Sequence, residues 1–198
     1  MFVTLEGIDG SGKSTQARLL AEALGEDAVL VREPGGTAAA ERVRELLADT
    51  ELELDPMAEL LLFCAARADL VRRVIRPALD AGHDVVSDRF SDSSAAYQGG
   101  GRGLGIELAE RLSGAAAEGV RPDLTVLLWL DPERAAERAG GEDRFEAAGL
   151  DFQLAVASAY EQIALQHPDR IVTVDASGSV EEVHERVMES LETAKSGH

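Results

Sequence analysis

Short apolar runs alternate along the chain with longer segments whose apolar residues recur every three or four positions. A short apolar run is typical of a buried strand, whereas the wider spacing is typical of a helix that buries one face. The pattern predicts strands at 2–6, 28–32, 84–88, 124–131 and 170–176, and helices that include 14–24, 38–49 and 56–80. Strands that alternate with helices pair in parallel through right-handed crossovers. We therefore expect a three-layer α/β fold, in which a five-stranded parallel sheet carries helices on both faces.

The chain is expected to form a single domain over residues 1–198. Its length matches the usual size of one domain, and neither a repeat nor a linker interrupts the pattern. Only residues 195–198 (KSGH) lack the pattern and are expected to form a loose tail. Ligands of parallel α/β sheets bind at the carboxyl ends of the strands. Residues that directly follow the predicted strands are therefore the first candidates for a functional site.

The charge of the chain limits its partners. It has 19 basic and 37 acidic residues, a net charge of −18, which disfavours binding to nucleic acid or to an anionic membrane. Because Lys13 and Lys195 are its only lysines, the acid-rich surface resembles that of proteins from a high-salt cytoplasm, which is a hypothesis about habitat. No apolar run is long enough to span a bilayer, and no signal peptide is readable. We expect a cytoplasmic protein, with the lone Cys64 packed in an apolar stretch.

A phosphate-binding loop is the first motif that indicates chemistry. Residues 7–14 read GIDGSGKS, fit the pattern G-x-x-x-x-G-K-[ST], and lie between a predicted strand and a predicted helix. The glycines let backbone N–H groups converge on phosphate oxygens, and the helix N-terminus and the lysine add positive charge. The motif predicts a P-loop NTPase fold that binds a nucleoside triphosphate through Gly7, Ile8, Asp9, Gly10, Ser11, Gly12, Lys13, Ser14 and Thr15.

The loop alone leaves the reaction open, because GTPases, ATPases and kinases share it. Asp9 adds information, since a carboxylate beside a triphosphate is unfavourable unless it serves a hydroxyl or a metal. A sugar 3′-hydroxyl would fit this requirement. The alternative is a loop carboxylate that points to water.

Four further groups of residues lie where ligands gather. They are 33–37 (EPGGT) after the second strand, Phe63 and Arg67 one helical turn apart, Asp88 and Arg89 at the end of the third strand, and 97–103 (YQGGGRG). In order and in approximate spacing, these groups and the phosphate loop resemble thymidylate kinases of the bacterial type along nearly the whole chain. The resemblance implies transfer of the γ-phosphate of ATP to dTMP, giving dTDP for dTTP synthesis, with Mg²⁺ as cofactor.

The resemblance also implies a role for each matching residue. Those assigned to the acceptor are Asp9, Glu33, Pro34, Phe63, Arg67, Arg89, Ser94, Tyr97 and Gln98, and those assigned to Mg²⁺ are Ser14, Asp88 and Glu33. Phe63 would stack on thymine, Arg67 would bond its O4, and Ser94 would meet its N3/O4 edge. Tyr97 would crowd the 2′ side of the sugar, and Arg89 would hold the acceptor phosphate. Without the family, Phe63 reads as a core residue, and Asp88 with Arg89 reads equally well as a structural ion pair.

Two features of the family concern a lid and an interface. Bacterial relatives carry arginines in a lid after the fourth strand, and the corresponding stretch here, about 134–146, is short. Lys13 and Arg89 are the other catalytic candidates, and either Arg138 or Arg144 would complete them from the lid, whereas Arg134 reads as a residue of the helix surface. The resemblance further implies a homodimer through the helices around 57–79.

Two rival functions stay open at this point. One is a kinase for another nucleoside monophosphate such as UMP or dUMP, because Ser94 alone does not require the methyl group of thymine. The other is a nucleotide-dependent switch that signals through its conformation. An acceptor pocket separates a kinase from a switch, and Phe63, Arg67 and Arg89 favour the kinase.

Overall fold

The computed structural model describes residues 1–138 and 149–196, and it contains one five-stranded parallel sheet in the order β2-β3-β1-β4-β5. The strands are β1 (Phe2–Glu6), β2 (Val29–Arg32), β3 (Val85–Asp88), β4 (Leu124–Trp129) and β5 (Ile171–Asp175). The helices are α1 (Lys13–Leu24), α2 (Ala38–Ala48), α3 (Pro56–Leu70), α4 (Arg76–Asp80), α5 (Ser91–Ser94), α6 (Ile106–Ala116), α7 (Pro132–Arg138), α8 (Leu150–Gln166) and α9 (Val180–Ser196). Two π-helical segments, η1 (Val71–Ile75) and η2 (Ala95–Gly101), continue α3 and α5. The predicted fold class is confirmed.

The first strand of the chain lies at the centre of the sheet. β1 pairs with β3, where Phe2 lies opposite Val85, and with β4, where Val3 lies opposite Leu124. All five residues of β1 are buried, as expected for a strand covered on both faces. The phosphate loop leaves the carboxyl end of this central strand and therefore has neighbouring strand ends on both sides.

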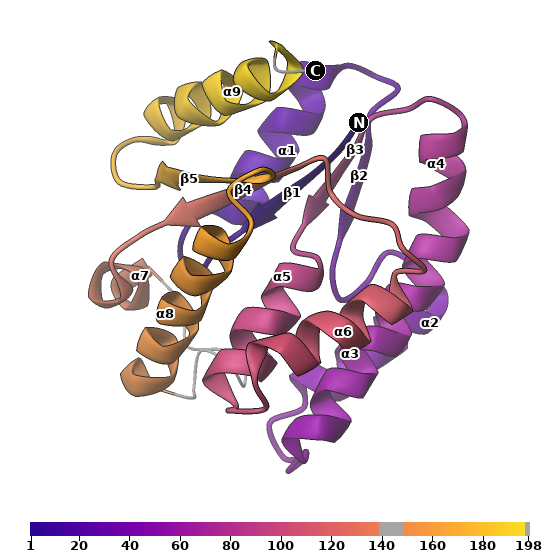
Figure 1. The fold of residues 1–198 in the computed structure, drawn as a ribbon, viewed down its shortest axis with the longest axis vertical. Coiled ribbons are helices and arrows are strands. Elements are labelled where there is room, and N and C mark those ends of the chain that lie inside the picture. The colour runs from indigo at the N-terminus through magenta and orange to yellow at the C-terminus, as the bar shows by residue number, and fades with distance from the viewer. Residues whose placement is uncertain (139–148, 197–198) are drawn as a thin grey trace.

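Helices form the two outer layers (Figure 1). α1 and α9 pack against each other, and they contact the strands β1 to β3 and β4 to β5 respectively. A second group of helices, α5, α6 and α8, packs around η2, while α2 packs on α3. Local signals set two of the helix starts. The side chain of Thr37 accepts a hydrogen bond from Ala40 N at the start of α2, and Asp55 accepts one from Met57 N just before Pro56.

The long helix predicted over 56–80 is present but is not one regular α-helix. α3 passes into the π-helical η1 before α4 begins, and the N–H of Arg76 donates to Val71 O, which is five residues earlier. Pro77 follows directly, and a proline provides no N–H and crowds the preceding turn. The wider π turn accommodates it. Hydrophobic spacing predicts that a helix exists here, but not this local widening.

The ends of several elements differ from the prediction. β2 and β3 each begin one residue later than expected, and β4 ends at Trp129. The loose tail expected from residue 195 is wrong in part, because α9 continues to Ser196. Val183, Val187 and Leu191 bury one face of this helix, and α9 packs on α1. Of the lid expected over about 134–146, the structure describes the residues up to Arg138, and the rest lies outside the described residues.

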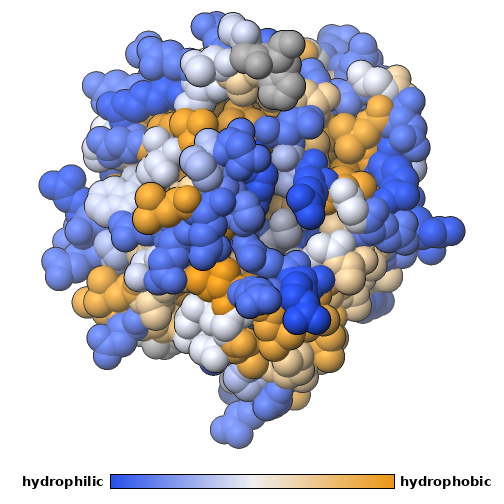
Figure 2. All heavy atoms as spheres, in the orientation of Figure 1, coloured by the Kyte–Doolittle hydropathy of each residue, from blue (hydrophilic) through white to orange (hydrophobic). Residues whose placement is uncertain are grey.

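The surface is largely hydrophilic on the face seen in Figure 2, with apolar side chains in scattered groups. The larger apolar core includes Leu5, Leu20, Val126, Leu128 and Ile163, which come from the sheet and from helices of both layers. Cys64 is buried and is not disulfide-bonded, as expected. Within the described parts of the chain, no helix combines the length and the apolar character needed to cross a membrane.

Candidate active site

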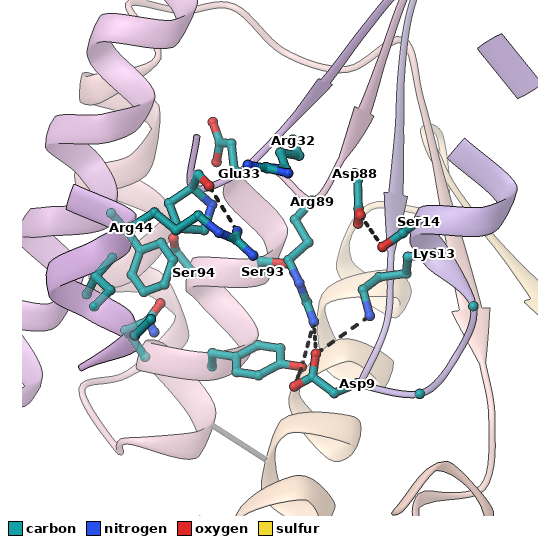
Figure 3. A pocket seen from close by; sticks show the side chains of 18 of the residues that line it. Asp9, Lys13, Ser14, Arg32, Glu33, Arg44, Asp88, Arg89, Ser93 and Ser94 are labelled. Carbon is teal, nitrogen blue, oxygen red and sulfur yellow. Dashed lines mark hydrogen bonds and ion pairs between the residues drawn. The ribbon is translucent and has the colours of Figure 1, made fainter. Parts of the chain in front are cut away.

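A cleft of about 560 Å³ opens where the carboxyl ends of β1, β2 and β3 meet (Figure 3). The phosphate loop forms one side of this cleft. The opposite side comes from α2, from Phe63 of α3 and from the α5–η2 segment. The cleft therefore joins a triphosphate-binding loop to a second pocket that has its own aromatic and charged side chains.

Lys13 is the first residue of α1, and its ammonium group folds back over the loop. Its Nζ donates a hydrogen bond to Ile8 O at 2.7 Å and lies 3.9 Å from Asp9 Oδ1. Burial and the nearby guanidinium of Arg89 lower the pKa of Lys13 to about 8, against the opposing effect of Asp9. A buried cation of this kind gains from any anion that arrives, so the loop is prepared for phosphate.

Gly10 shows why the loop requires glycine. Its φ of 81° lies in the left-handed region, which side-chain-bearing residues rarely adopt. A Cβ at this position would also overlap the carbonyl oxygen of Ala135 in α7. The phosphate loop therefore rests directly against the backbone of α7, the helix that leads to Arg138.

Ser14 and Asp88 lie side by side at the end of the cleft nearest α1. Ser14 Oγ donates to Asp88 Oδ2 at 2.5 Å. The other carboxylate oxygen, Asp88 Oδ1, is buried and has no hydrogen-bond partner among the described residues. A buried carboxylate oxygen without a partner is unfavourable unless a cation or a water molecule reaches it. The pair therefore offers two oxygen atoms of the kind that Mg²⁺ prefers as ligands.

Arg89 occupies the middle of the cleft and contacts both sides. Its backbone adopts a φ of 70°, which turns the chain sharply after β3. One terminal nitrogen donates to Gly7 O and to Ser93 Oγ, both at 3.1 Å, and to Tyr160 OH at 3.4 Å. The other forms an ion pair with Asp9 and donates to Tyr97 OH at 3.0 Å. Arg89 therefore links the phosphate loop to the second pocket.

Asp9 is held as an anion by its neighbours. Burial would raise the pKa of its carboxyl group, but Arg89 and Lys13 outweigh burial and lower it. The hydroxyl of Tyr97 also donates to Asp9 Oδ2 at 2.9 Å. An ionised carboxylate of this kind is a hydrogen-bond acceptor in the middle of the cleft.

A buried ion pair forms the floor of the second pocket. Arg67 Nε and Nη2 both donate to Glu33, with the shortest contact at 2.6 Å, and Nη2 also donates to Ser94 Oγ at 3.1 Å. Arg67 is only 1% exposed, and its Nη1 has no hydrogen-bond partner among the described residues. The pair leaves one buried guanidinium nitrogen without a hydrogen-bond partner in the described parts of the chain, behind Glu33 and Ser94, which line the cleft.

The structure brings most of the predicted site residues together. The following predicted residues line the cleft: Asp9, Gly10, Gly12, Lys13, Ser14, Thr15, Glu33, Pro34, Phe63, Asp88, Arg89, Ser94, Tyr97, Gln98 and Arg138. Gly7, Ile8 and Ser11 shape the loop from beneath, and Arg67 lies behind Glu33 and Ser94. Arg144 lies outside the described residues.

Sequence reasoning missed several residues of the cleft. Arg32, Arg44, Leu47, Ala48 and Ser93 line it as well. Arg44 could have been suspected, because it follows the EPGGT segment on a helix at the edge of the second pocket, where its guanidinium donates to Pro34 O at 3.1 Å. Ser93 gave no signal, because a serine one residue before Ser94 has no distinctive spacing.

The glycines of YQGGGRG serve packing. A Cβ on Gly100 would overlap the Cβ of Ala159 in α8, so glycine lets η2 approach that helix closely. Arg102 of the same motif stacks over Phe152 of α8 at 4.6 Å and pairs with the buried carboxylate of Glu59. The motif thus fixes η2, and with it Tyr97 and Gln98, between α6 and α8.

This packing predicts that Gly100→Ala destabilises the fold by about 1–3 kcal/mol, the usual effect of overfilling a tight contact. Urea unfolding followed by circular dichroism measures the change in free energy. Gly114→Ala is the matched control, because a Cβ there meets nothing within 4 Å on helix α6. It should stabilise the protein by about 0.5–1 kcal/mol. Equal stability of Gly100→Ala and the wild type would mean that η2 does not depend on this contact.

The phosphate loop shares one cleft with a second pocket, and that pocket contains an arginine and an aromatic side chain suited to a phosphate acceptor. This combination defines a P-loop kinase. The family model described as thymidylate kinase matches residues 5–187. The chain belongs to the thymidylate kinase family.

Individual relatives agree with this assignment. A thymidylate kinase of Pelobacter propionicus is 46% identical over 200 residues, which cover 94% of this chain and 91% of that relative. One of Deinococcus radiodurans is 43% identical over 205 residues and covers 100% and 98% of the two chains. The crystal structure of thymidylate kinase from Ehrlichia chaffeensis superposes with a TM-score of 0.79 at 37% identity, covering 96% of this chain and 98% of that one. The resemblance inferred from the motifs is confirmed.

Proposed function

We propose that this chain phosphorylates dTMP to dTDP with ATP as the donor. The observation that supports it best is the position of Arg89, which contacts the phosphate loop at Gly7 O and the second pocket at Tyr97. A cation at that junction lies where two sets of phosphates would meet. Membership in the thymidylate kinase family supports dTMP as the acceptor.

The second pocket suits a deoxynucleoside monophosphate. Phe63 would offer an aromatic face to the base, and the buried guanidinium of Arg67 would donate a hydrogen bond to thymine O4. Ser94 and Gln98 line the same region, and Gln98 Nε2 is held by Glu59 at 3.0 Å. Asp9 would accept the 3′-hydroxyl of the sugar. These assignments follow the family resemblance and stay predictions.

The proposed reaction needs alignment and charge neutralisation more than a strong base. An oxygen of the acceptor phosphate attacks the γ-phosphorus while the bond from that phosphorus to the β,γ-bridging oxygen breaks, and ADP leaves. Lys13 would neutralise the donor phosphates, and Arg89 would neutralise the acceptor phosphate. Arg32 and Arg44, both exposed at the cleft, add positive charge on the acceptor side.

Mg²⁺ is the cofactor that we propose for this cleft. Ser14 and Asp88 would hold it, since Asp88 Oδ1 is an unused buried acceptor beside the Ser14 hydroxyl. When bound, the ion neutralises phosphate charge and orients the donor. The assignment of Glu33 to this metal stays a prediction, and its carboxylate is engaged by Arg67. We assign Glu33 chiefly to orienting Arg67.

A lid arginine would complete the charge neutralisation during transfer. Arg138 ends α7, is exposed and lines the cleft, so it is the described candidate. Arg144 remains the second candidate. Arg134, also on α7, is exposed and does not line the cleft.

Further properties rest on the resemblance and on composition. A single domain, a homodimer through helices α3 and α4, and a cytoplasmic location are proposed for this chain. Its net charge of −18 supports the absence of a nucleic-acid partner and the hypothesis of a high-salt habitat.

Calorimetric titration with nucleoside monophosphates, paired with an ADP-release assay, tests the function. We expect dTMP to bind and to be phosphorylated more efficiently than dUMP or UMP. Preference for UMP or dUMP would assign the chain to the rival kinase activity. ATP binding without binding of any monophosphate would favour a nucleotide-dependent switch.

Phe63→Ala should raise the KM for dTMP by roughly 10- to 100-fold, since stacking of a base on an aromatic ring contributes about 1–3 kcal/mol. The kcat should change less, because the ring does not touch the transferred phosphate. Steady-state kinetics at varied dTMP separate the two effects. Leu61→Ala, on the same helix but exposed and outside the cleft, is the matched control and should leave this KM unchanged. An unchanged KM in Phe63→Ala would remove Phe63 from the base site.

A further inference from the structure

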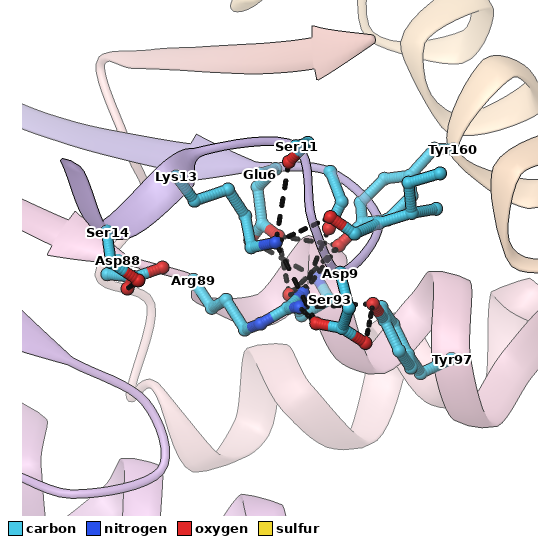
Figure 4. Close-up of polar contacts among 12 residues, drawn as sticks. Glu6, Asp9, Ser11, Lys13, Ser14, Asp88, Arg89, Ser93, Tyr97 and Tyr160 are labelled. Carbon is cyan, nitrogen blue, oxygen red and sulfur yellow. Dashed lines mark hydrogen bonds and ion pairs between the residues drawn. The ribbon is translucent and has the colours of Figure 1, made fainter. Parts of the chain in front are cut away.

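A fully buried acid, Glu6, lies directly before the phosphate loop at the end of β1 (Figure 4). Its Oε1 accepts hydrogen bonds from Phe90 N at 2.7 Å and from Ser93 N at 3.2 Å. Its Oε2 accepts from Ser93 Oγ at 2.5 Å and from Tyr160 OH at 2.8 Å. A single carboxylate thus ties the central strand to α5 and to α8.

These bonds determine which way two hydroxyl groups point. A hydroxyl has one proton to donate, and both Ser93 and Tyr160 direct theirs toward Glu6. Their lone pairs are then free to accept from Arg89, whose Nη1 lies 3.1 Å from Ser93 Oγ and 3.4 Å from Tyr160 OH. Glu6 therefore acts on Arg89 indirectly, by orienting the two hydroxyl groups that accept hydrogen bonds from its guanidinium.

We infer that Glu6 is a positioning residue for the kinase reaction, because it orients the Ser93 and Tyr160 hydroxyls so that they hold the guanidinium of Arg89 in the cleft. The inference rests on the proposed function and adds a residue that does not line the cleft. An apolar side chain could not replace Glu6, because it would leave Phe90 N, Ser93 N and the two hydroxyls without this acceptor.

The charged groups around Glu6 make its contacts with the two hydroxyls sensitive to pH. The charged and titratable groups that face Glu6 are Lys13 of α1, Arg67 of α3, Arg89 after β3, Asp92 of α5, Tyr160 of α8 and Arg170 before β5. Burial and the nearby Asp92 raise the pKa of Glu6 to about 7. Below that pH Glu6 carries a proton of its own and can no longer accept from both hydroxyls. The Ser93 and Tyr160 hydroxyls are then less well oriented to accept from Arg89 as the pH falls.

Glu6→Gln tests the inference with little change in shape. The amide oxygen can still accept from the two backbone N–H groups, but the NH₂ group donates toward the hydroxyls and turns their protons toward Arg89. We expect kcat for dTMP to fall about 10²-fold, the usual effect of misplacing a catalytic group by about 1 Å. In the Arg89→Ala background, Glu6→Gln should cause no further loss. Such non-additivity is the signature of action through Arg89.

The pH profile provides a second readout that a purely structural role would not change. The wild type should lose kcat/KM as the pH falls through about 7, and Glu6→Gln should lack this part of the decline. The phosphate of dTMP itself titrates near pH 6 in both enzymes, so the difference between the two profiles is the measured quantity.

A control and a second variant complete the experiment. Thr4 lies on the same strand as Glu6, and Thr4→Val removes a buried hydrogen bond to Thr125 of β4, so it should lower stability and combine additively with Arg89→Ala. Tyr160→Phe removes one hydroxyl only, and it replaces Glu6→Gln in the cycle if that variant does not fold. Additive losses with Arg89→Ala, or identical pH profiles, in an enzyme that phosphorylates dTMP would overturn the inference alone. A wild type that does not phosphorylate dTMP would overturn the proposed function and this inference with it.

Discussion

Lys13→Ala is expected to lower the turnover of dTMP by on the order of 10³-fold, near the upper end of what removal of one preorganised charge-stabilising donor costs. Lys13 is buried against the loop, and burial together with Arg89 holds its pKa at about 8, so its ammonium is poised to gain from the charge of bound phosphates. Release of ADP at saturating ATP and dTMP measures the effect. Lys13→Arg should not restore activity, because a planar guanidinium does not fit where a compact ammonium reaches Ile8 O at 2.7 Å.

The chain supplies its own control for Lys13. Lys195, its only other lysine, is exposed near the end of α9 and far along the chain from the cleft. Lys195→Ala removes the same charge and should leave kcat unchanged. A Lys13→Ala enzyme with turnover within about tenfold of the wild type would contradict the role of this residue in the loop.

Arg89→Ala should lower kcat/KM for dTMP by on the order of 10³-fold or more, because it removes the cation that joins the two halves of the cleft. The variant also removes the nearer of the two cations that pair with Asp9 and leaves Lys13, so we expect the pKa of that carboxyl group to rise. ATP binding, measured by calorimetry, should change much less than dTMP binding. Normal turnover in this variant would contradict the assignment of the acceptor site.

Arg89→Lys and Arg111→Ala sharpen the test. Lysine keeps the charge but cannot reproduce the fork of contacts to Ser93, Tyr97 and Asp9, so Arg89→Lys should restore little activity. Arg111 is exposed on α6 and does not line the cleft, and its replacement should leave both substrates bound as in the wild type.

The parts of the fold and site that depend on local patterns were predictable. The apolar run of β1 and the helical spacing of α1 place the phosphate loop between these two elements, as the structure shows. Phe63 and Arg67 were predicted to share a helix face, and Asp88 and Arg89 were predicted at the end of a strand. Each of these predictions follows from the spacing of apolar residues or from residues that are neighbours in the sequence.

Contacts between distant residues were not predictable in the same way. Glu6 reads as one polar position at the end of an apolar strand, and its partner Tyr160 is 154 residues away on helix α8. Arg67 was assigned to a base by resemblance, but its ion pair with Glu33 depends on how α3 faces the end of β2. The π turns depend on packing and on Pro77, which hydrophobic spacing does not reveal.

The central position of β1 in the sheet affects how the protein can fold while the ribosome synthesises it. The strand made first pairs with β3 through Phe2 and Val85 and with β4 through Val3 and Leu124. Loops of this length close slowly, because their ends must meet before the pairing can stabilise them. The strands on both sides of β1, which position the phosphate loop, are therefore not both present until more than half of the chain has been synthesised. Bound nucleotide should therefore stabilise only a chain that extends past β4, and not the earlier intermediates of folding.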